Sequence, residues 1–164
     1  MRDELTSNTM ASKNREQIDQ QFMQQALSVA QLGMEAGEVP VGAVLVRDDL
    51  ILATAHNRTT IDKDPTAHAE MIVMREAASQ GSHPRLDGAT LYVTIEPCTM
   101  CAGALLQARI QRLVFGAREA RTGAVLSIAE TLMNPSNTHQ ISVSEGVLAE
   151  DAAALMQRFF AAKR

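Results

Sequence analysis

Two short motifs contain the residues whose types and spacing are suited to chemistry. Glu70 lies two positions after His68, and Cys98 and Cys101 are separated by two residues. One imidazole and two thiolates supply three of the four ligands of tetrahedral Zn²⁺, and catalytic sites leave the fourth position to water. A neighbouring carboxylate can move protons. These residues therefore predict a hydrolytic metal centre with Glu70 as its acid and base.

Both motifs are expected at the beginnings of helices. His68 and Glu70 would point about 200° apart on a helix, so they can converge only at a helix end. Thr66 is expected to cap the first of these helices, with His68 in its first turn. Cys98 is expected to open the next helix, and Cys101 then lies on the same face. Two helix N-termini would favour the thiolate forms of the cysteines.

Other interpretations of these residues remain open. A structural zinc site needs a fourth protein ligand, for which His56, His83, His139 or a carboxylate is available. Alternatively, the histidine of the first motif is an ordinary packed or capping residue, and the cysteines are merely buried. Redox chemistry at the Cys-x-x-Cys sequence would need a thioredoxin-like context.

Composition limits the class of protein. The chain has 164 residues, of which 46% are hydrophobic and 21% are charged, as is typical of one soluble domain. No apolar run approaches the ~20 residues that span a bilayer, and residues 1–4 lack the pattern of a secretory signal. We therefore expect a cytoplasmic protein without membrane contact. The formal net charge of −4 argues against indiscriminate polyanion binding, so any nucleic-acid contact should be confined.

Hydrophobic periodicity predicts strands that alternate with helices. The expected helices cover residues 15–37, 66–79, 98–108 and 149–162, with a short one within 122–133, and the expected strands cover 41–46, 51–55, 90–94, 112–115 and 140–144. The first two strands should form a hairpin, and the alternation favours a mostly parallel sheet covered by helices. Residues 1–14 are polar and expected to be flexible, and residues 15–164 to form a single domain.

The motifs resemble the signature of the cytidine and deoxycytidylate deaminase superfamily of zinc enzymes, which combines His-x-Glu with Pro-Cys-x-x-Cys. Other stretches resemble the branch that deaminates the wobble adenosine of bacterial transfer RNA. These stretches are Glu38–Val44, His56–Arg58, Asp64–Glu70, Leu91–Cys98 and Val114–Arg118. The resemblance extends from about Phe22 to Phe160, which is most of the chain.

The resemblance implies an α/β fold with three αβα layers around a central five-stranded mixed sheet, as in cytidine deaminases. It implies one Zn²⁺ per subunit, bound by His68, Cys98 and Cys101, and a homodimer. The implied substrate is the anticodon stem-loop of an arginine transfer RNA, and DNA is not expected as a natural substrate. Glu70 would take a proton from the zinc-bound water and pass it to the purine, so that adenosine becomes inosine and ammonia leaves.

The resemblance also implies a set of substrate-binding residues. They are Asn57 for the target nucleoside; Val39, Pro40, Ala69, Ile95 and Pro97 for the base pocket; and Arg118, Glu119 and His139 for neighbouring nucleotides. The sequence departs from the family at Glu119, where Asp is usual, and at Thr138, where Asn is usual. These departures leave the metal ligands and Glu70 unchanged, so they bear on which RNA is accepted.

Two other functions remain open on the sequence. The same site chemistry would serve a deaminase of a free nucleobase or nucleoside, such as guanine or cytosine. An RNA-binding protein with a structural zinc ion and no activity is a further alternative. Phe159 and Phe160, near the end of the chain, are more typical of a core than of a surface on which bases stack.

Overall fold

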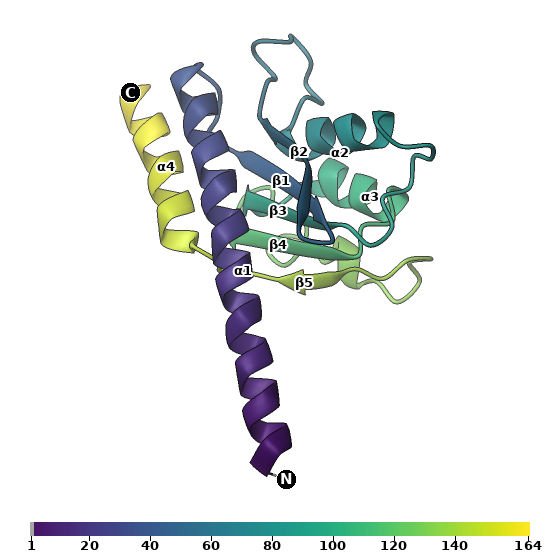
Figure 1. Ribbon diagram of the computed structural model, residues 1–164. Coiled ribbons are helices and arrows are strands. Elements are labelled where there is room, and N and C mark those ends of the chain that lie inside the picture. The colour runs from purple at the N-terminus through teal and green to yellow at the C-terminus, as the bar shows by residue number, and fades with distance from the viewer. Residues whose placement is uncertain (1) are drawn as a thin grey trace.

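The fold consists of three layers, with a sheet between two pairs of helices. The computed structural model describes residues 2–164, with side chains from residue 11 onward. Its elements are α1 (Arg2–Glu35), β1 (Gly42–Arg47), β2 (Leu50–His56), α2 (Ala69–Ser79), β3 (Thr90–Ile95), α3 (Thr99–Gln107), β4 (Arg112–Ala117), a 3₁₀ turn (Thr131–Met133), β5 (Ser142–Ser144) and α4 (Ala149–Ala162). Helices α1 and α4 cover one face of the sheet, and α2 and α3 cover the other (Figure 1). The three-layer αβα fold implied by the resemblance is therefore confirmed.

The five-stranded sheet has the order β2-β1-β3-β4-β5 and is mixed. Strand β1 is antiparallel to β2 and β3, whereas β3, β4 and β5 are parallel to one another. The mixed sheet is confirmed. Four of its strands, β2, β3, β4 and β5, run in the same direction, as the alternation of strands and helices predicted, and β1 runs in the opposite direction between β2 and β3. The carboxyl ends of β3 and β4 share one edge, directly before Cys98.

The hairpin between β1 and β2 is also confirmed. Its turn consists of Asp48 and Asp49, both of which have positive φ values, of 52° and 60°. Two consecutive left-handed residues match the twist of the flanking strands, and Asp tolerates this conformation better than most residues.

Helix α1 begins at Arg2, well before the start expected near Arg15. The sequence contains no Gly or Pro before Gly33, so nothing in it interrupts the helix. The first part of α1 extends beyond the sheet (Figure 1). Met1 lies outside the described residues, and the flexibility of residues 1–14 stays a prediction, as does the domain boundary after them. No helix within residues 2–164 is long and apolar enough to cross a membrane.

Strand β3 is buried on both faces, which explains its continuous apolar sequence. Leu91 and Val93 pack in the cluster under α2 and α3, together with Val73 and Leu105. Tyr92, between them, packs instead in the cluster under α1 with Phe22. Side chains on a strand alternate between faces, so one strand contributes to both cores.

A buried ion pair fixes α1 to the opposite end of the sheet from Cys98. The Arg112 guanidinium donates to both carboxylate oxygens of Asp19, at 2.7 Å each, and the Tyr92 hydroxyl donates to the same carboxylate at 2.9 Å. Burial, together with this neighbouring carboxylate, raises the pKa of Tyr92. The pair therefore holds two layers of the fold together.

Candidate active site

The three expected metal ligands lie at the N-terminal ends of α2 and α3. His68 directly precedes α2 and has an extended conformation, with φ −73° and ψ 151°. Cys98 occupies the same place before α3, with φ −76° and ψ 176°, and Cys101 lies in the first turn. The expectation that both motifs mark helix beginnings is confirmed. His68, however, lies one residue before the first turn of α2 rather than within it.

Thr66 does not cap α2, and this prediction is wrong. Its N–H and its hydroxyl both donate to Asp64 Oδ1 at 2.8 Å, because α2 begins too late for Thr66 to reach it. Asn57, from the segment after β2, supplies the cap instead, since the Ala69 N–H donates to Asn57 Oδ1 at 2.9 Å. The Asn57 amide is thereby oriented, and its NH₂ group is left as the donor for a ligand.

The geometry of the three ligands fits Zn²⁺. His68 Nδ1 lies 3.6 Å from Cys98 Sγ and 3.6 Å from Cys101 Sγ. Tetrahedral zinc, with bonds of about 2.3 Å to sulfur and about 2.05 Å to nitrogen, separates the two kinds of ligand atom by about 3.6 Å. The two cysteines are free thiols rather than a disulfide. The donor set and its spacing are therefore those of a zinc site.

A fourth protein ligand is absent among the side chains described from residue 11 onward. The cluster of candidate ligand atoms within 4.8 Å of one another contains His68, Cys98 and Cys101 alone. The other histidines have different partners: His56 contacts the Asn57 carbonyl oxygen, His83 accepts from the Arg85 N–H, and His139 contacts the Ile110 carbonyl oxygen. A structural zinc site with four protein ligands is not supported. The arrangement instead leaves one position for water.

Glu70 is a buried carboxyl group beside the metal ligands, with 3% of its surface exposed. Burial raises its pKa to about 7, although the nearby His68 and Cys101 act in the opposite direction. A carboxyl group with a pKa near neutrality can accept a proton in one step and donate it in another. The structure thus brings Glu70, the predicted acid and base, to the three residues predicted as metal ligands.

The two thiols differ in their proton affinity. The pKa of Cys98 is lowered to about 3, chiefly by a hydrogen bond from Cys101 and also by His68. The pKa of Cys101 is raised, because this thiol holds the shared proton and is buried. Binding of a metal ion requires both thiolates, so it must release the proton from Cys101.

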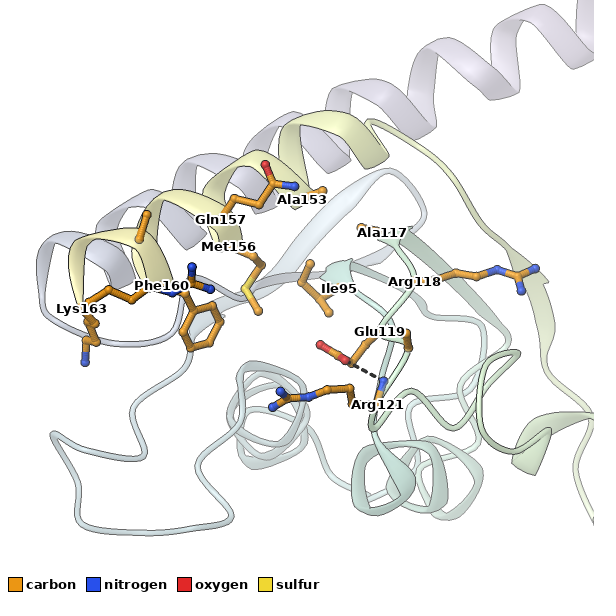
Figure 2. Close-up of a pocket in the computed structure, with 13 residues that line it drawn as sticks. Ile95, Ala117, Arg118, Glu119, Arg121, Ala153, Met156, Gln157, Phe160 and Lys163 are labelled. Atoms are coloured by element: carbon orange, nitrogen blue, oxygen red, sulfur yellow. Dashed lines mark hydrogen bonds between the residues drawn. The ribbon is translucent and has the colours of Figure 1, made fainter.

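A cavity of about 900 Å³ lies between α4 and the segment that follows β4, at the carboxyl ends of β3 and β4 (Figure 2). It is lined by Ile95, Ala117, Arg118, Glu119, Ala120, Arg121, Ala153, Met156, Gln157, Phe160, Ala161, Lys163 and Arg164. Four of these side chains are basic and one is acidic, so the cavity is positively charged in a chain of net negative charge. Ile95, at the end of β3, is the lining residue nearest in sequence to the ligand cluster, three residues before Cys98, whereas His68, Glu70, Cys98 and Cys101 do not line the cavity.

Arg118 and Glu119 are adjacent in sequence but differ in their surroundings. Arg118 points away from the middle of the cavity (Figure 2) and donates to both oxygens of Glu145, at 2.6 and 2.7 Å. Glu119 Oε1 accepts from the Arg121 N–H at 2.9 Å. Glu145 was not among the expected site residues. It lies 27 residues after Arg118, and nothing in the sequence between them indicated that the two side chains form an ion pair.

The remaining expected substrate residues fall into two groups. Pro40, Ala69, Ile95 and Pro97 are buried and Val39 is half-buried. Ala69 directly follows His68 and Pro97 directly precedes Cys98, whereas Val39 and Pro40 precede Val41, whose carbonyl oxygen accepts from the Asn57 N–H at 3.1 Å. His139 is not brought to this site. It contacts Ile110 at the amino end of β4, whereas the cavity lies at the carboxyl end, roughly 20 Å away along six residues.

Sequence reasoning missed two buried glutamates and one aromatic residue. Glu38 accepts from the N–H groups of Thr60 and Ile61, at 2.9 and 2.7 Å, and orders the segment after Asn57. Glu96 orders the segment after β4 in the same way. For Glu96, the available signal was a carboxylate directly after a largely apolar strand, because such a group needs partners when it is buried. Phe159 is buried as expected, but Phe160 is 46% exposed and lines the cavity.

The fold and the site define a zinc-binding deaminase. Residues 16–117 match the family described as the cytidine and deoxycytidylate deaminase zinc-binding region, and the chain belongs to this family. It is 44% identical to the tRNA-specific adenosine deaminase of Haemophilus influenzae, over 94% of this chain and 90% of that protein. It is 42% identical to the enzyme of the same name from Bacillus subtilis, over 87% of this chain and 88% of that protein.

A solved structure from a study of A-to-I editing by tRNA:A34 deaminases at the wobble position of transfer RNA is also similar. It shares 44% sequence identity with this chain, and the TM-score is 0.80. The match covers 82% of this chain and 98% of the other chain.

Proposed function

We propose that this protein converts adenosine to inosine at the wobble position of transfer RNA, with release of ammonia. The observation that carries the proposal is the extent of the similarity, which covers 98% of a chain from the study of tRNA:A34 deaminases. The TM-score of 0.80 over this length supports a likeness that is much longer than the metal motif. The anticodon stem-loop of an arginine transfer RNA is the proposed substrate, and transfer RNA implies a cytoplasmic site of action.

The residues of the site have distinct proposed roles. His68 Nδ1, Cys98 Sγ and Cys101 Sγ would hold one Zn²⁺ in each subunit. When bound, this ion lowers the pKa of a water molecule and so supplies the nucleophile for attack on C6 of the purine. Glu70 moves the protons, first to its own carboxylate and then to the purine. Its raised pKa supports this role, since both protonation states are accessible near neutral pH.

Asn57 is proposed to donate a hydrogen bond to the target nucleoside. Its carbonyl oxygen already accepts from Ala69, so its NH₂ group can face the base pocket. Val39, Pro40, Ile95 and Pro97, with Ala69, would form the apolar walls of that pocket. Apolar walls exclude water and strengthen the polar contacts within the pocket.

The RNA is proposed to bind across the basic cavity. The target base must leave the anticodon loop before its C6 atom can reach the metal centre, so neighbouring nucleotides need a binding site of their own. Arg118 and Glu119 lie at the cavity, and Arg121 adds a second cation. Arg118 would exchange Glu145 for a phosphate group, which has the same bidentate geometry.

A homodimer is proposed on the position of His139. This residue lies at the far end of β4 from the cavity of its own chain, so the nucleotide contact that the resemblance implies for it would be made at the site of a second subunit. Analytical ultracentrifugation of the protein with and without the stem-loop would test the dimer.

Incubation with the anticodon stem-loop of an arginine transfer RNA, followed by detection of inosine, tests the proposed activity. Inosine should form with the native protein and not with Glu70→Gln, while both retain about one zinc ion per chain. Turnover of free guanine or cytosine without inosine in the RNA would instead establish the alternative substrate class. Absence of zinc from a reconstituted sample would contradict both.

A further inference from the structure

The segment of residues 119–127, here called the 119–127 loop, borders both the cavity and the metal centre. Its first residues, Glu119 and Arg121, line the cavity. Further along, Gly123 pairs with Cys98 as in an antiparallel sheet, and the Ala124 N–H donates to the Pro97 carbonyl oxygen at 2.9 Å. The position of this loop therefore sets where the cavity lies relative to a metal ligand.

The carboxylate of Glu96 binds this loop at both of its ends. Glu96 Oε2 accepts from the Glu119 N–H at 3.0 Å and from the Ser127 hydroxyl. Glu96 Oε1 accepts from the N–H groups of Val125, Leu126 and Ser127, at 3.1, 2.7 and 3.0 Å. Only 3% of the Glu96 surface is exposed. One buried side chain thus joins the beginning of the loop to its end.

Gly123 allows this close approach. A Cβ atom at residue 123 would collide with the carboxylate of Glu96 and would lie 2.5 Å from the Glu119 carbonyl oxygen. Any larger residue would therefore push the loop away from Glu96.

Packing and one further hydrogen bond also hold the second half of the loop, because Val125 is fully buried in the core cluster and the Thr131 N–H donates to the Ala124 carbonyl oxygen at 3.1 Å. Other hydrogen bonds only close local turns. The Gly123 N–H donates to the Glu119 carbonyl oxygen, and the Ile128 N–H donates to the Gly123 carbonyl oxygen. Such turns would persist if the whole loop moved. The second half is thus fixed by the burial of Val125, the bonds to Glu96 and the pairing with residues 97 and 98, whereas the half that lines the cavity is tied by the bond from the Glu119 N–H to Glu96.

We propose that Glu96 is a positioning residue for the RNA-binding surface: through the 119–127 loop it places Glu119 and Arg121 beside the metal centre. This inference rests on the proposed function. Glu96 itself contacts no substrate in this arrangement. Because Glu70 and the metal ligands lie outside the loop, loss of Glu96 should affect binding of RNA more than the chemical step.

The variant Glu96→Gln tests the inference. Its amide oxygen can still accept from Val125, Leu126 and Ser127, but its NH₂ group would face the Glu119 N–H and release that end of the loop. We expect the KM for the stem-loop to rise about tenfold and kcat to stay within about threefold, as for loss of one buried hydrogen bond. Zinc content should be unchanged, and hydrogen exchange of the Glu119 amide should become faster.

Two further variants guard against a general loss of folding. Gly123→Ala should raise KM by displacing the loop, whereas Gly81→Ala, where an added Cβ meets only ordinary contacts at 3.7 Å, should not. Ser127→Ala removes one of the five donors and should raise KM only about two- to threefold. Asp19→Asn, the matched loss of a buried carboxylate far from the loop, should lower stability without changing KM.

The outcomes are distinguishable. If the native protein forms inosine, two results would overturn the positioning role. One is an unchanged KM in both Glu96→Gln and Gly123→Ala. The other is a loss of kcat and of zinc in these variants without a rise in KM. A native protein that forms no inosine would refute the proposed function instead. In that case the exchange rate of the Glu119 amide still shows whether Glu96 fixes the loop.

Discussion

Asn57 has two functions that can be separated by substitution. Its carbonyl oxygen accepts from the Ala69 N–H at 2.9 Å, and its NH₂ group is the proposed donor to the target nucleoside. Asn57→Asp retains an oxygen for Ala69 and removes the NH₂ donor. Asn57→Ala removes both, and it leaves the buried Ala69 N–H group unpaired directly after His68, a proposed metal ligand.

The expected magnitudes follow from the surroundings of Asn57, which is 8% exposed. An unpaired buried N–H costs about 1–3 kcal/mol, so Asn57→Ala should unfold at a lower denaturant concentration and bind zinc more weakly. In Asn57→Asp the new charge at the N-terminus of α2 is favourable by about 0.3–1 kcal/mol and its burial opposes this, so stability should change little. Its kcat/KM should nevertheless fall about tenfold to a hundredfold.

Denaturant unfolding, zinc analysis and inosine formation, measured on the same preparations, test this separation. Both variants should lose activity, and only Asn57→Ala should lose stability and zinc affinity. Full activity in Asn57→Asp would show that the NH₂ group does not contact the substrate. Unchanged stability in Asn57→Ala would show that the bond to Ala69 does not support the beginning of α2.

Three further predictions concern charged side chains. Glu70→Gln should lower kcat by about 10²–10⁴-fold with zinc retained, because the amide cannot carry a proton; single-turnover kinetics with zinc analysis would show this, and residual activity within tenfold of native would contradict it. Glu145→Gln should free Arg118 to contact the RNA and so tighten RNA binding by up to about fivefold at low salt. Fluorescence anisotropy would measure this change. Weaker binding would instead mean that Glu145 positions Arg118 for the RNA. Asp19→Asn should lower the free energy of unfolding by about 3 kcal/mol, since it leaves the buried Arg112 poorly paired, and leave kcat unchanged; a stability equal to that of the native protein would rule out a structural role for this pair.

The parts of the site that were predictable are those encoded by short-range spacing. Cys98 and Cys101 can share one metal ion because they are three residues apart at the beginning of a helix, and His68 can join them only from a second helix end. Burial of Glu70 follows from the same placement. The alternation of strands and helices likewise predicted the layers. It did not predict the order of the strands, which depends on the side of β1 on which the connection through α2 places β3.

The parts that were not predictable depend on contacts between distant segments. Asn57 caps α2 in place of Thr66 because the segment after β2 lies against the beginning of that helix. Both Asn and Thr are common capping residues, so the residue types alone do not show which of the two is the cap. The partner of Arg118 is Glu145, which reaches it only because β5 lies beside β4. Glu96 directly follows the largely apolar strand β3, so the sequence indicated a carboxylate that needs partners. Those partners, such as Glu119, could be identified only from the three-dimensional structure.

The placement of the metal ligands has a consequence for the order in which the fold opens. His68 and Cys98 lie 30 residues apart, on either side of α2 and β3. An ion bound by both would act as a cross-link that closes this loop, and a covalent link of that span is worth about 3–4 kcal/mol in chain entropy. Helices α1 and α4 lie on the other face, where packing holds both helices and Asp19 also ties α1 to the sheet. Chelation should therefore loosen the α2 and α3 layer first, which makes hydrogen exchange in α2 a reporter of metal occupancy.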